Sequence, residues 1–130
     1  MLTAFTSKAY RKALTKRLSG FSEAADLPPG GRAEQLLIDA MFMALGRLAK
    51  MDGRVTLGEI NYAEKVMKRM ALRGDKRRQA IIAYDRGKHP DSELFTALDA
   101  VARVIGKRSA LAKLFLQVQC EAAHLKGNLR

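Results

Sequence analysis

The stretch from Leu48 to Met70, LAKMDGRVTLGEINYAEKVMKRM, constrains the fold of this chain more than any other. An apolar helical pattern runs into Asp52-Gly53, and a second pattern begins at Thr56. Glycine accepts the left-handed conformation that ends many helices. Thr56 with Glu59 three residues later has the spacing of a capping box, which starts a helix. The sequence therefore predicts two helices joined by a tight turn, and we expect an all-α domain.

Composition supports one folded domain with an aliphatic core. The chain has 130 residues, of which 48% are hydrophobic and only 6% aromatic, so leucine, isoleucine, valine, alanine and methionine must fill the interior. Neither a signal peptide nor an apolar run of about 18 residues is present, and we expect no membrane span. The single cysteine, Cys120, excludes an internal disulfide, and its apolar neighbours LFLQVQC predict a buried thiol in a reducing compartment.

Apolar residues recur at three- and four-residue steps along most of the chain, which predicts a compact bundle of about five to six helices. Ile60, Ile81 and Phe95 fall among the expected core residues. Glycines are expected to end three of the helices, at Gly74, Gly87 and Gly106, and Ser109 is expected to cap the last one. The expected helices are residues 2–18, 32–50, 56–72, 76–85, 92–105 and 110–124.

The sequence suggests two regions. Residues 1–31 are a basic amphipathic arm that ends in the linker DLPPGG, where two prolines and two glycines interrupt helical structure. Residues 32–130 form the helical domain. Gly53 and Gly127 each follow a core helix, which suggests two related halves. Because no capped helix follows Gly127, we expect a fragment boundary there, and a missing helix would leave apolar surface for a homodimer.

Basic residues outnumber acidic ones and give a net charge of +11. Such an excess is typical of proteins that meet polyanions, anionic membranes or acidic partners, and it also occurs on solvated surfaces. No zinc-finger, RNP or KH signature accompanies it. We therefore favour a solvated or partner-facing surface, and we leave nucleic-acid binding and peripheral membrane binding open. The basic residues form two clusters, one of Lys8, Arg11, Lys12, Lys16 and Arg17, and one of Lys65, Lys68, Arg69, Arg73, Lys76, Arg77 and Arg78.

From Leu36 to Leu129 the chain resembles the TerB-like helical domain of DjlA-type co-chaperones. The resemblance is carried by GRLAKMDGRVTLGEI, EKVMKRMALRG, the GK of DRGKHPD, and KLFLQVQCEAAHLKGNL. It implies an all-α domain in the cytoplasm or at the cytoplasmic face of the inner membrane. Proteins of this type join the domain to a membrane anchor and to a J domain that stimulates a DnaK-type chaperone. Here a basic arm stands in place of the anchor and no complete J domain follows, so we expect no ATPase stimulation by this chain alone.

The tripeptide His89-Pro90-Asp91 matches the signature of J domains, and the basic stretch KRRQAIIAYDR precedes it. The opening helix of a J domain is absent upstream, and a tripeptide also occurs by chance. Proline and an acidic residue also suit the start of a helix. We interpret the tripeptide as a loop that enters the next helix, with a J-type site as the alternative.

Asp52 and Glu59 are the candidate metal ligands. The resemblance to TerB-like domains implies a divalent cation at such an Asp-Gly…Glu element, but a hard cation needs several more oxygen ligands. Lys126 occupies the position where the second half would supply another aspartate. The turn and the capping box account for both residues without a metal.

Catalysis has no recognisable centre in the sequence. His89 and His124 lie outside any Ser-His-Asp, Cys-His or metal-ligand pattern, although Cys120 precedes His124 by one helical turn. No phosphate-binding loop is present, and we expect no cofactor. We therefore predict a non-enzymatic interaction domain of a DjlA-like co-chaperone that works with a DnaK-type chaperone. The alternatives are a metal-responsive tellurite or stress-resistance protein, and a basic module that binds nucleic acid or anionic membranes.

Overall fold

A computed structural model describes residues 8, 10, 12, 32–51, 53–106 and 110–128. Residues 8, 10 and 12 are helical, and the other described residues form five α-helices joined by turns and loops. None of the described residues lies in a strand, so the predicted all-α bundle is confirmed. The helices are α2 (Arg32–Ala49), α3 (Leu57–Arg69), α4 (Asp75–Gly87), α5 (Leu94–Ile105) and α6 (Ala110–Asn128). Within this part of the chain, none of the helices has the length and apolar character needed to cross a bilayer.

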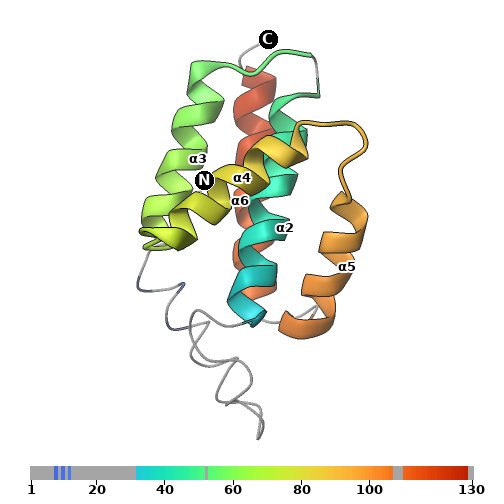
Figure 1. The fold of residues 1–130 in the computed structure, drawn as a ribbon. Helices are drawn as coiled ribbons and strands as arrows, with labels where there is room; N and C mark the ends of the chain where they lie inside the picture. Colours follow the sequence, from blue (N-terminus) through green and yellow to red (C-terminus); the bar gives the residue numbers. More distant parts are fainter. Residues whose placement is uncertain are drawn as a thin grey trace, which may run out of the picture.

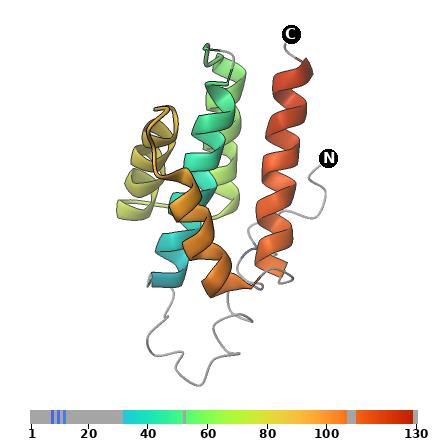
Figure 2. The ribbon, with the colours of Figure 1, turned by 90° about the vertical axis from the view of Figure 1, so that its right-hand side faces the viewer.

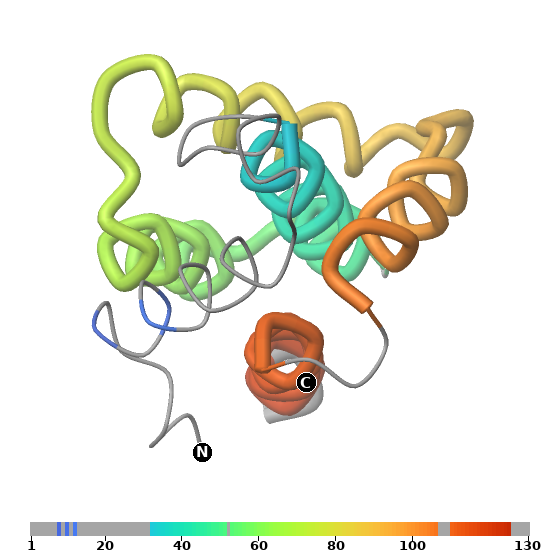
Figure 3. Tube along the Cα trace, turned by 90° about the horizontal axis from the view of Figure 1, so that it is seen from below, coloured from blue at the N-terminus to red at the C-terminus, as the bar shows by residue number. Residues whose placement is uncertain are grey.

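Helix α2 is the centre of the bundle. It lies between α4 and α6, with α3 and α5 on its two flanks (Figure 3). Helix α4 crosses α2 at a steep angle (Figure 1), whereas α6 runs alongside α2 (Figure 2). Phe42, Leu37, Ile38 and Met41 of α2 are at most 1% exposed. The predicted central helix is therefore confirmed, and its burial on most sides supplies much of the hydrophobic stabilisation.

Two glycines set the distance between α2 and α4. A Cβ atom at Gly46 would lie 2.0 Å from the carbonyl oxygen of Tyr84, and one at Gly87 would lie 2.0 Å from that of Met43. Each helix therefore brings its backbone directly against the other at a glycine. Gly87 was expected to end α4, and it is the last residue of that helix, but it is not among the residues with positive φ. Its role is close helix packing.

The turn between α2 and α3 has the predicted chemistry. Gly53 has a φ of +83°, and its N–H donates to the carbonyl of Lys50 at 2.9 Å. Thr56 caps α3, and the capping box with Glu59 is complete. The two residues satisfy amide groups that would otherwise lack partners at the start of the helix.

Helix α3 ends earlier than predicted. Ala71 has a φ of +57°, its N–H donates to Lys68, and the N–H of Leu72 donates to Met67. This pair of bonds is a Schellman ending, in which the left-handed residue is normally glycine. The prediction that Gly74 ends the helix is therefore wrong, because the chain reverses three residues earlier and Gly74 instead precedes α4.

Four predicted core residues are exposed. Ile60 and Ile81 are 42% and 39% exposed, Phe95 is 82% exposed, and Cys120 is also exposed. In each case the helix packs through a narrower face than periodicity suggested. Helix α4 uses mainly small residues at its close contact, and α6 buries one stripe. The buried stripes are Ala80, Ala83 and Gly87 in α4, Leu94, Val101 and Ile105 in α5, and Leu111, Leu114, Val118 and Ala122 in α6.

Several predictions concern residues outside the described part of the chain. These are most of the arm, the linker, Asp52 and the Ser109 cap. The division at residue 31 stays a prediction, although Tyr10 belongs to the same buried core as the helices. Gly127 lies within α6, so the prediction that it forms a turn equivalent to that of Gly53 is wrong.

Candidate interaction surface

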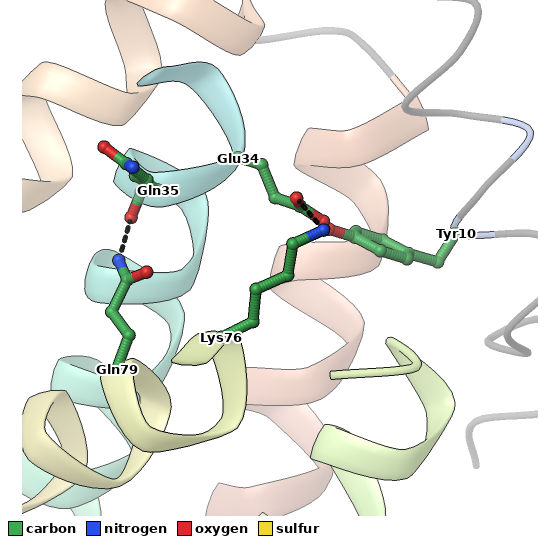
Figure 4. Close-up of polar contacts among 5 residues, drawn as sticks. All are labelled: Tyr10, Glu34, Gln35, Lys76 and Gln79. Carbon is green, nitrogen blue, oxygen red and sulfur yellow. Dashed lines mark hydrogen bonds and ion pairs between the residues drawn. The ribbon is translucent and has the colours of Figure 1, made fainter. Parts of the chain in front are cut away.

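A buried carboxylate joins three segments at one end of the bundle. Glu34, in the first turn of α2, is 4% exposed. The Tyr10 hydroxyl donates to Glu34 Oε2 at 2.8 Å, and Lys76 Nζ of α4 lies 2.8 Å from Glu34 Oε1 (Figure 4). The hydrogen bond and the ion pair offset the cost of burying the charge. The Glu34 side chain therefore connects Tyr10 to α2 and, through Lys76, to α4.

Burial and charge also act on the tyrosine. Tyr10 is 2% exposed, and its desolvation, followed by the nearby negative charge of Glu34, raises the pKa of its phenol well above the ordinary value. The phenol therefore stays protonated and keeps its role as a hydrogen-bond donor. This site was not predicted from the sequence. The available signal was a glutamate on the apolar face of α2, three residues before the buried Leu37.

Gln79 makes a second polar link between α2 and α4. Its Nε2 donates to the backbone carbonyl of Gln35 at 3.0 Å (Figure 4). The same Nε2 also donates to Asp39 Oδ1 at 3.0 Å. Asp39 and Gln79 also line a groove along the α2–α4 seam with Ile82 and Arg86. The contact between α2 and α4 therefore combines close backbone packing at Gly46 and Gly87 with polar contacts made by Gln79.

Arg47 of α2 holds the connection between α4 and α5. Its Nη2 donates to the carbonyls of His89 and Pro90 and to Ser92 Oγ at 2.9–3.3 Å, and its Nε donates to the carbonyl of Gly87 at 3.3 Å. The planar guanidinium holds several N–H donors in fixed directions, so it can bind several acceptor oxygens at once. Nothing in the sequence pattern marked Arg47 for this role.

The tripeptide His89-Pro90-Asp91 lies in this connection, with all three residues exposed. The predicted loop position agrees with the structure, but the predicted helix entry is wrong, because α5 begins at Leu94 with Glu93 as its N-cap. Arg47 uses the backbone of the tripeptide and leaves its side chains at the surface. A J-type role for these residues stays untested.

The second basic cluster is partly neutralised. Lys76 pairs with Glu34, Arg77 with Glu64, and Arg78 with Asp75. The two more exposed pairs, Arg77 with Glu64 and Arg78 with Asp75, are of a kind that contributes little to stability, typically about 0–1 kcal/mol. The exposed members of the two clusters include Lys8, Lys12, Lys65, Lys68 and Arg73, and Arg69 is partly buried. Arg11, Lys16 and Arg17 lie outside the described residues. The positive charge is thus spread over several elements.

Glu59 is the described member of the candidate metal pair. It is 7% exposed, and its Oε1 accepts hydrogen bonds from the Thr56 amide and hydroxyl, each at 3.0 Å. In the described part of the chain, His, Cys, Asp and Glu side chains form no group of three that could hold a metal ion. Since Asp52 lies outside that part, a divalent cation at Asp52 and Glu59 stays a prediction.

Tyr84 lies behind Glu59 in the interior. Both residues line a small cavity with Tyr62 and residues of α2 and α6. Burial, and then the negative charges of Glu59 and Asp85, raise the pKa of Tyr84 to about 12. Its hydroxyl is buried without a hydrogen-bond partner among the described residues. By contrast, the Tyr62 hydroxyl donates to the carbonyl of Val118 at 3.3 Å.

The surface of the described residues also carries a thiol, an imidazole and several large apolar side chains. Cys120 and His124 are both exposed on α6, four residues apart. The large apolar side chains that reach solvent lie on several elements and were mostly not predicted, because a single apolar residue carries no periodic signal. They are Met51, Leu57, Ile60, Ile81, Ile82, Phe95 and Leu116.

The described chain is an all-α domain, and its curated relatives are co-chaperones. No protein-family model matches the chain, and no solved structure matches it. The sequence comparison is therefore what connects the fold to a class of proteins.

The relatives are named co-chaperone protein DjlA. That of Shewanella oneidensis is 35% identical over 94 residues, which cover 72% of this chain and 36% of the relative. That of Vibrio vulnificus is 32% identical over 127 residues, covering 96% of this chain and 44% of the relative. That of Photobacterium profundum is 39% identical over 90 residues, or 69% and 32%. The chain is thus a homologue of a DjlA region, as predicted, and it spans less than half the length of these relatives.

Proposed function

We propose that this chain is a non-enzymatic protein-interaction and regulatory domain of a DjlA-like co-chaperone that acts with a DnaK-type chaperone in the cytoplasm or at the cytoplasmic face of the inner membrane. The observation that carries the proposal is the 35% identity over 94 residues to a protein named as a co-chaperone. The surface supports it, because large apolar side chains as well as basic ones are exposed.

The side of the domain that carries Phe95 is the candidate binding face. Phe95 lies in the first turn of α5 and is 82% exposed, more than any other large apolar side chain among the described residues. Exposed aromatic side chains frequently supply a large share of binding energy at protein interfaces. Arg47 holds the loop just before α5, so the start of this helix is presented on a fixed support. A rigid anchor loses little conformational entropy when it binds.

The test is binding of the full chain to a purified DnaK-type chaperone in its ATP and ADP states, measured by biolayer interferometry. We expect saturable binding in one of these states. Phe95→Ala should weaken it at least tenfold, because truncation removes the apolar anchor. A second assay measures the chaperone's ATPase with a separate J-domain protein, in the presence and absence of this chain. A change in that rate would support the regulatory role.

Leu116→Ala is the matched control, because Leu116 is 58% exposed on α6. Both substitutions should leave the melting temperature nearly unchanged, since neither side chain is buried. If the chain binds the chaperone in neither nucleotide state and leaves its ATPase rate unchanged, the proposed function is wrong. Equal losses for Phe95→Ala and Leu116→Ala would contradict the assigned face.

A divalent cation at Asp52 and Glu59 remains a separate proposal. Calorimetric titration of the full chain with calcium and with zinc tests it, and Asp52→Ala is the control variant. We expect heat of binding that Asp52→Ala abolishes, and a flat titration with the unmodified chain would reject the site. The capping box offers no direct support for a metal, because Glu59 already accepts bonds from Thr56.

A further inference from the structure

The place where Tyr10 is buried, beside Glu34 and Lys76, has the properties of a docking site that is filled by the chain itself. Tyr10 is buried, whereas the nearby Lys8 and Lys12 are exposed. Figure 4 shows the tyrosine hydroxyl pointing toward the Glu34 carboxylate, which Lys76 reaches from the other side. We call the surroundings of the Tyr10 side chain, with Glu34 and Lys76, the tyrosine seat.

We propose that the tyrosine seat is an exchangeable site, in which Tyr10 of one copy can be replaced by Tyr10 of a second copy of this chain. The occupant is defined by its chemistry, since the seat requires an aromatic ring that carries a hydroxyl donor on a basic segment. The exchange would link two copies through identical contacts. This inference is independent of the chaperone partner proposed above.

Two observations, one on the contact and one on the connecting sequence, support exchange of Tyr10 between copies. First, Lys76 makes its own ion pair with Glu34, so Glu34 should keep an oppositely charged partner when Tyr10 leaves, and the empty seat should not hold a lone buried charge. Second, the stretch between Tyr10 and Arg32 contains Pro28-Pro29-Gly30-Gly31, which no continuous helix can include. The sequence therefore allows no single continuous helix from Tyr10 to Arg32, and segments joined to a domain in this way can be exchanged between copies.

The occupant's charge also fits the seat. The buried acceptor is a carboxylate, and Lys8 and Lys12 flank the tyrosine with positive charge. A tyrosine whose hydroxyl stays neutral can enter without burying a second negative charge beside Glu34. In the unmodified chain the local copy of Tyr10 has the higher effective concentration, so exchange should become measurable when that copy is removed.

The experiment uses a fluorescent peptide of residues 1–20 and the full chain carrying Tyr10→Ala. We expect the peptide to bind this variant saturably in fluorescence anisotropy, and to bind the unmodified chain at least tenfold more weakly because its seat is filled. A control peptide with Tyr10→Phe keeps the ring and loses the donor. It should bind the Tyr10→Ala chain at least tenfold more weakly than the tyrosine peptide.

Glu34→Gln in the Tyr10→Ala background tests the acceptor, and we expect it to weaken binding of the tyrosine peptide. Equal binding to the unmodified and Tyr10→Ala chains would overturn the proposal, as would no binding to a Tyr10→Ala chain that circular dichroism shows to be folded. If Tyr10→Ala fails to fold, the full chain with Tyr10→Phe replaces it. That chain must then bind the tyrosine peptide more tightly than the unmodified chain does, and equal binding would again overturn the proposal.

Discussion

At the scale of single residues, the three described tyrosines occupy different environments although all are buried. Tyr10 donates to a carboxylate, Tyr62 donates to a backbone carbonyl, and the Tyr84 hydroxyl has no partner among the described residues. A hydrogen bond to a charged group is worth more than one to a neutral group, and a buried hydroxyl without a partner costs free energy. Replacing tyrosine by phenylalanine should therefore change the free energy of unfolding by different amounts at these positions.

Tyr10→Phe should lower the free energy of unfolding by about 1.5–3 kcal/mol, the usual range for a hydrogen bond to a charged group. Tyr84→Phe should leave it unchanged or raise it by up to about 1 kcal/mol, because it removes a buried hydroxyl that lacks a partner. The ring of Tyr84, which lies 5.0 Å below the Lys88 amine, is retained. Urea unfolding of both variants measures the difference, and a larger loss for Tyr84→Phe would contradict the assignment.

The same residues predict a loss of stability at alkaline pH. The pKa of Tyr84 is about 12 in the folded chain against an ordinary value of 10.0, and the pKa values of Tyr10 and Tyr62 are raised as well. The native state therefore holds phenolic protons that the unfolded state releases. Stability from this source is complete below pH 10 and falls as the pH rises toward 12.

Circular dichroism and tyrosinate absorbance, followed together through this pH range, test the prediction. We expect helix loss and tyrosine ionisation to occur in one transition, because the buried phenols ionise when the fold opens. Tyr84→Phe is the control and should move the transition to higher pH. Ionisation of all three tyrosines near pH 10 with the helices intact would show that the phenols are not protected.

At the scale of elements, the crossing of α2 and α4 depends on glycine rather than on interlocking side chains. Gly46 faces the backbone of Tyr84, and Gly87 faces the backbone of Met43. Backbone atoms cannot change rotamer to make room, so an added methyl group must push the helices apart. The polar contacts of Gln79 and Arg47 along the same pair of helices would be strained together with the apolar contact.

Gly46→Ala and Gly87→Ala should each lower the free energy of unfolding by at least about 1–3 kcal/mol, the usual cost of overpacking. Gly58→Ala is the matched control, because Gly58 is exposed in α3 and has no positive φ. There alanine should stabilise the helix by about 0.5–1 kcal/mol. Thermal unfolding of the three variants measures the contrast, and mild effects at both Gly46 and Gly87 would contradict the close approach.

At the scale of the whole molecule, the net charge of +11 is spread over a small domain. Charges of one sign repel each other, and the compact state suffers more from this than the unfolded chain does. The described ion pairs are mostly partly exposed or exposed, so they offset little of the repulsion. Salt that screens the surface should therefore stabilise the fold.

The melting temperature should rise when sodium chloride increases from low concentration to about 0.5 M, where the screening length is only a few ångströms. A gain of about 1 kcal/mol corresponds to roughly 4 °C for a domain of this size. Lys65→Glu lowers the net charge by two at an exposed position of α3 and should reduce the salt dependence. A melting temperature that falls with added salt would show that ion pairs outweigh repulsion.

The presence of the helices could be predicted from the sequence, whereas the face that each helix buries could not. Capping by Thr56 and Glu59 depends on residues within one turn, and the structure has it as predicted. The exposure of Phe95 and Cys120 depends on which stripe of each helix meets α2, and periodicity defines that only to within a residue. The seat of Tyr10 joins residues 24 apart in sequence, a distance over which local patterns carry no information.

The glycine contact of α2 and α4 has a consequence for how this domain can change over time. Most interior substitutions can be compensated by a smaller residue on the facing element. At Gly46 and Gly87 the facing groups are main-chain carbonyls, which no second mutation can trim. A genetic search for suppressors of either alanine variant should therefore recover reversions or stabilising substitutions elsewhere. It should recover no compensating substitution at the facing residue of the other helix.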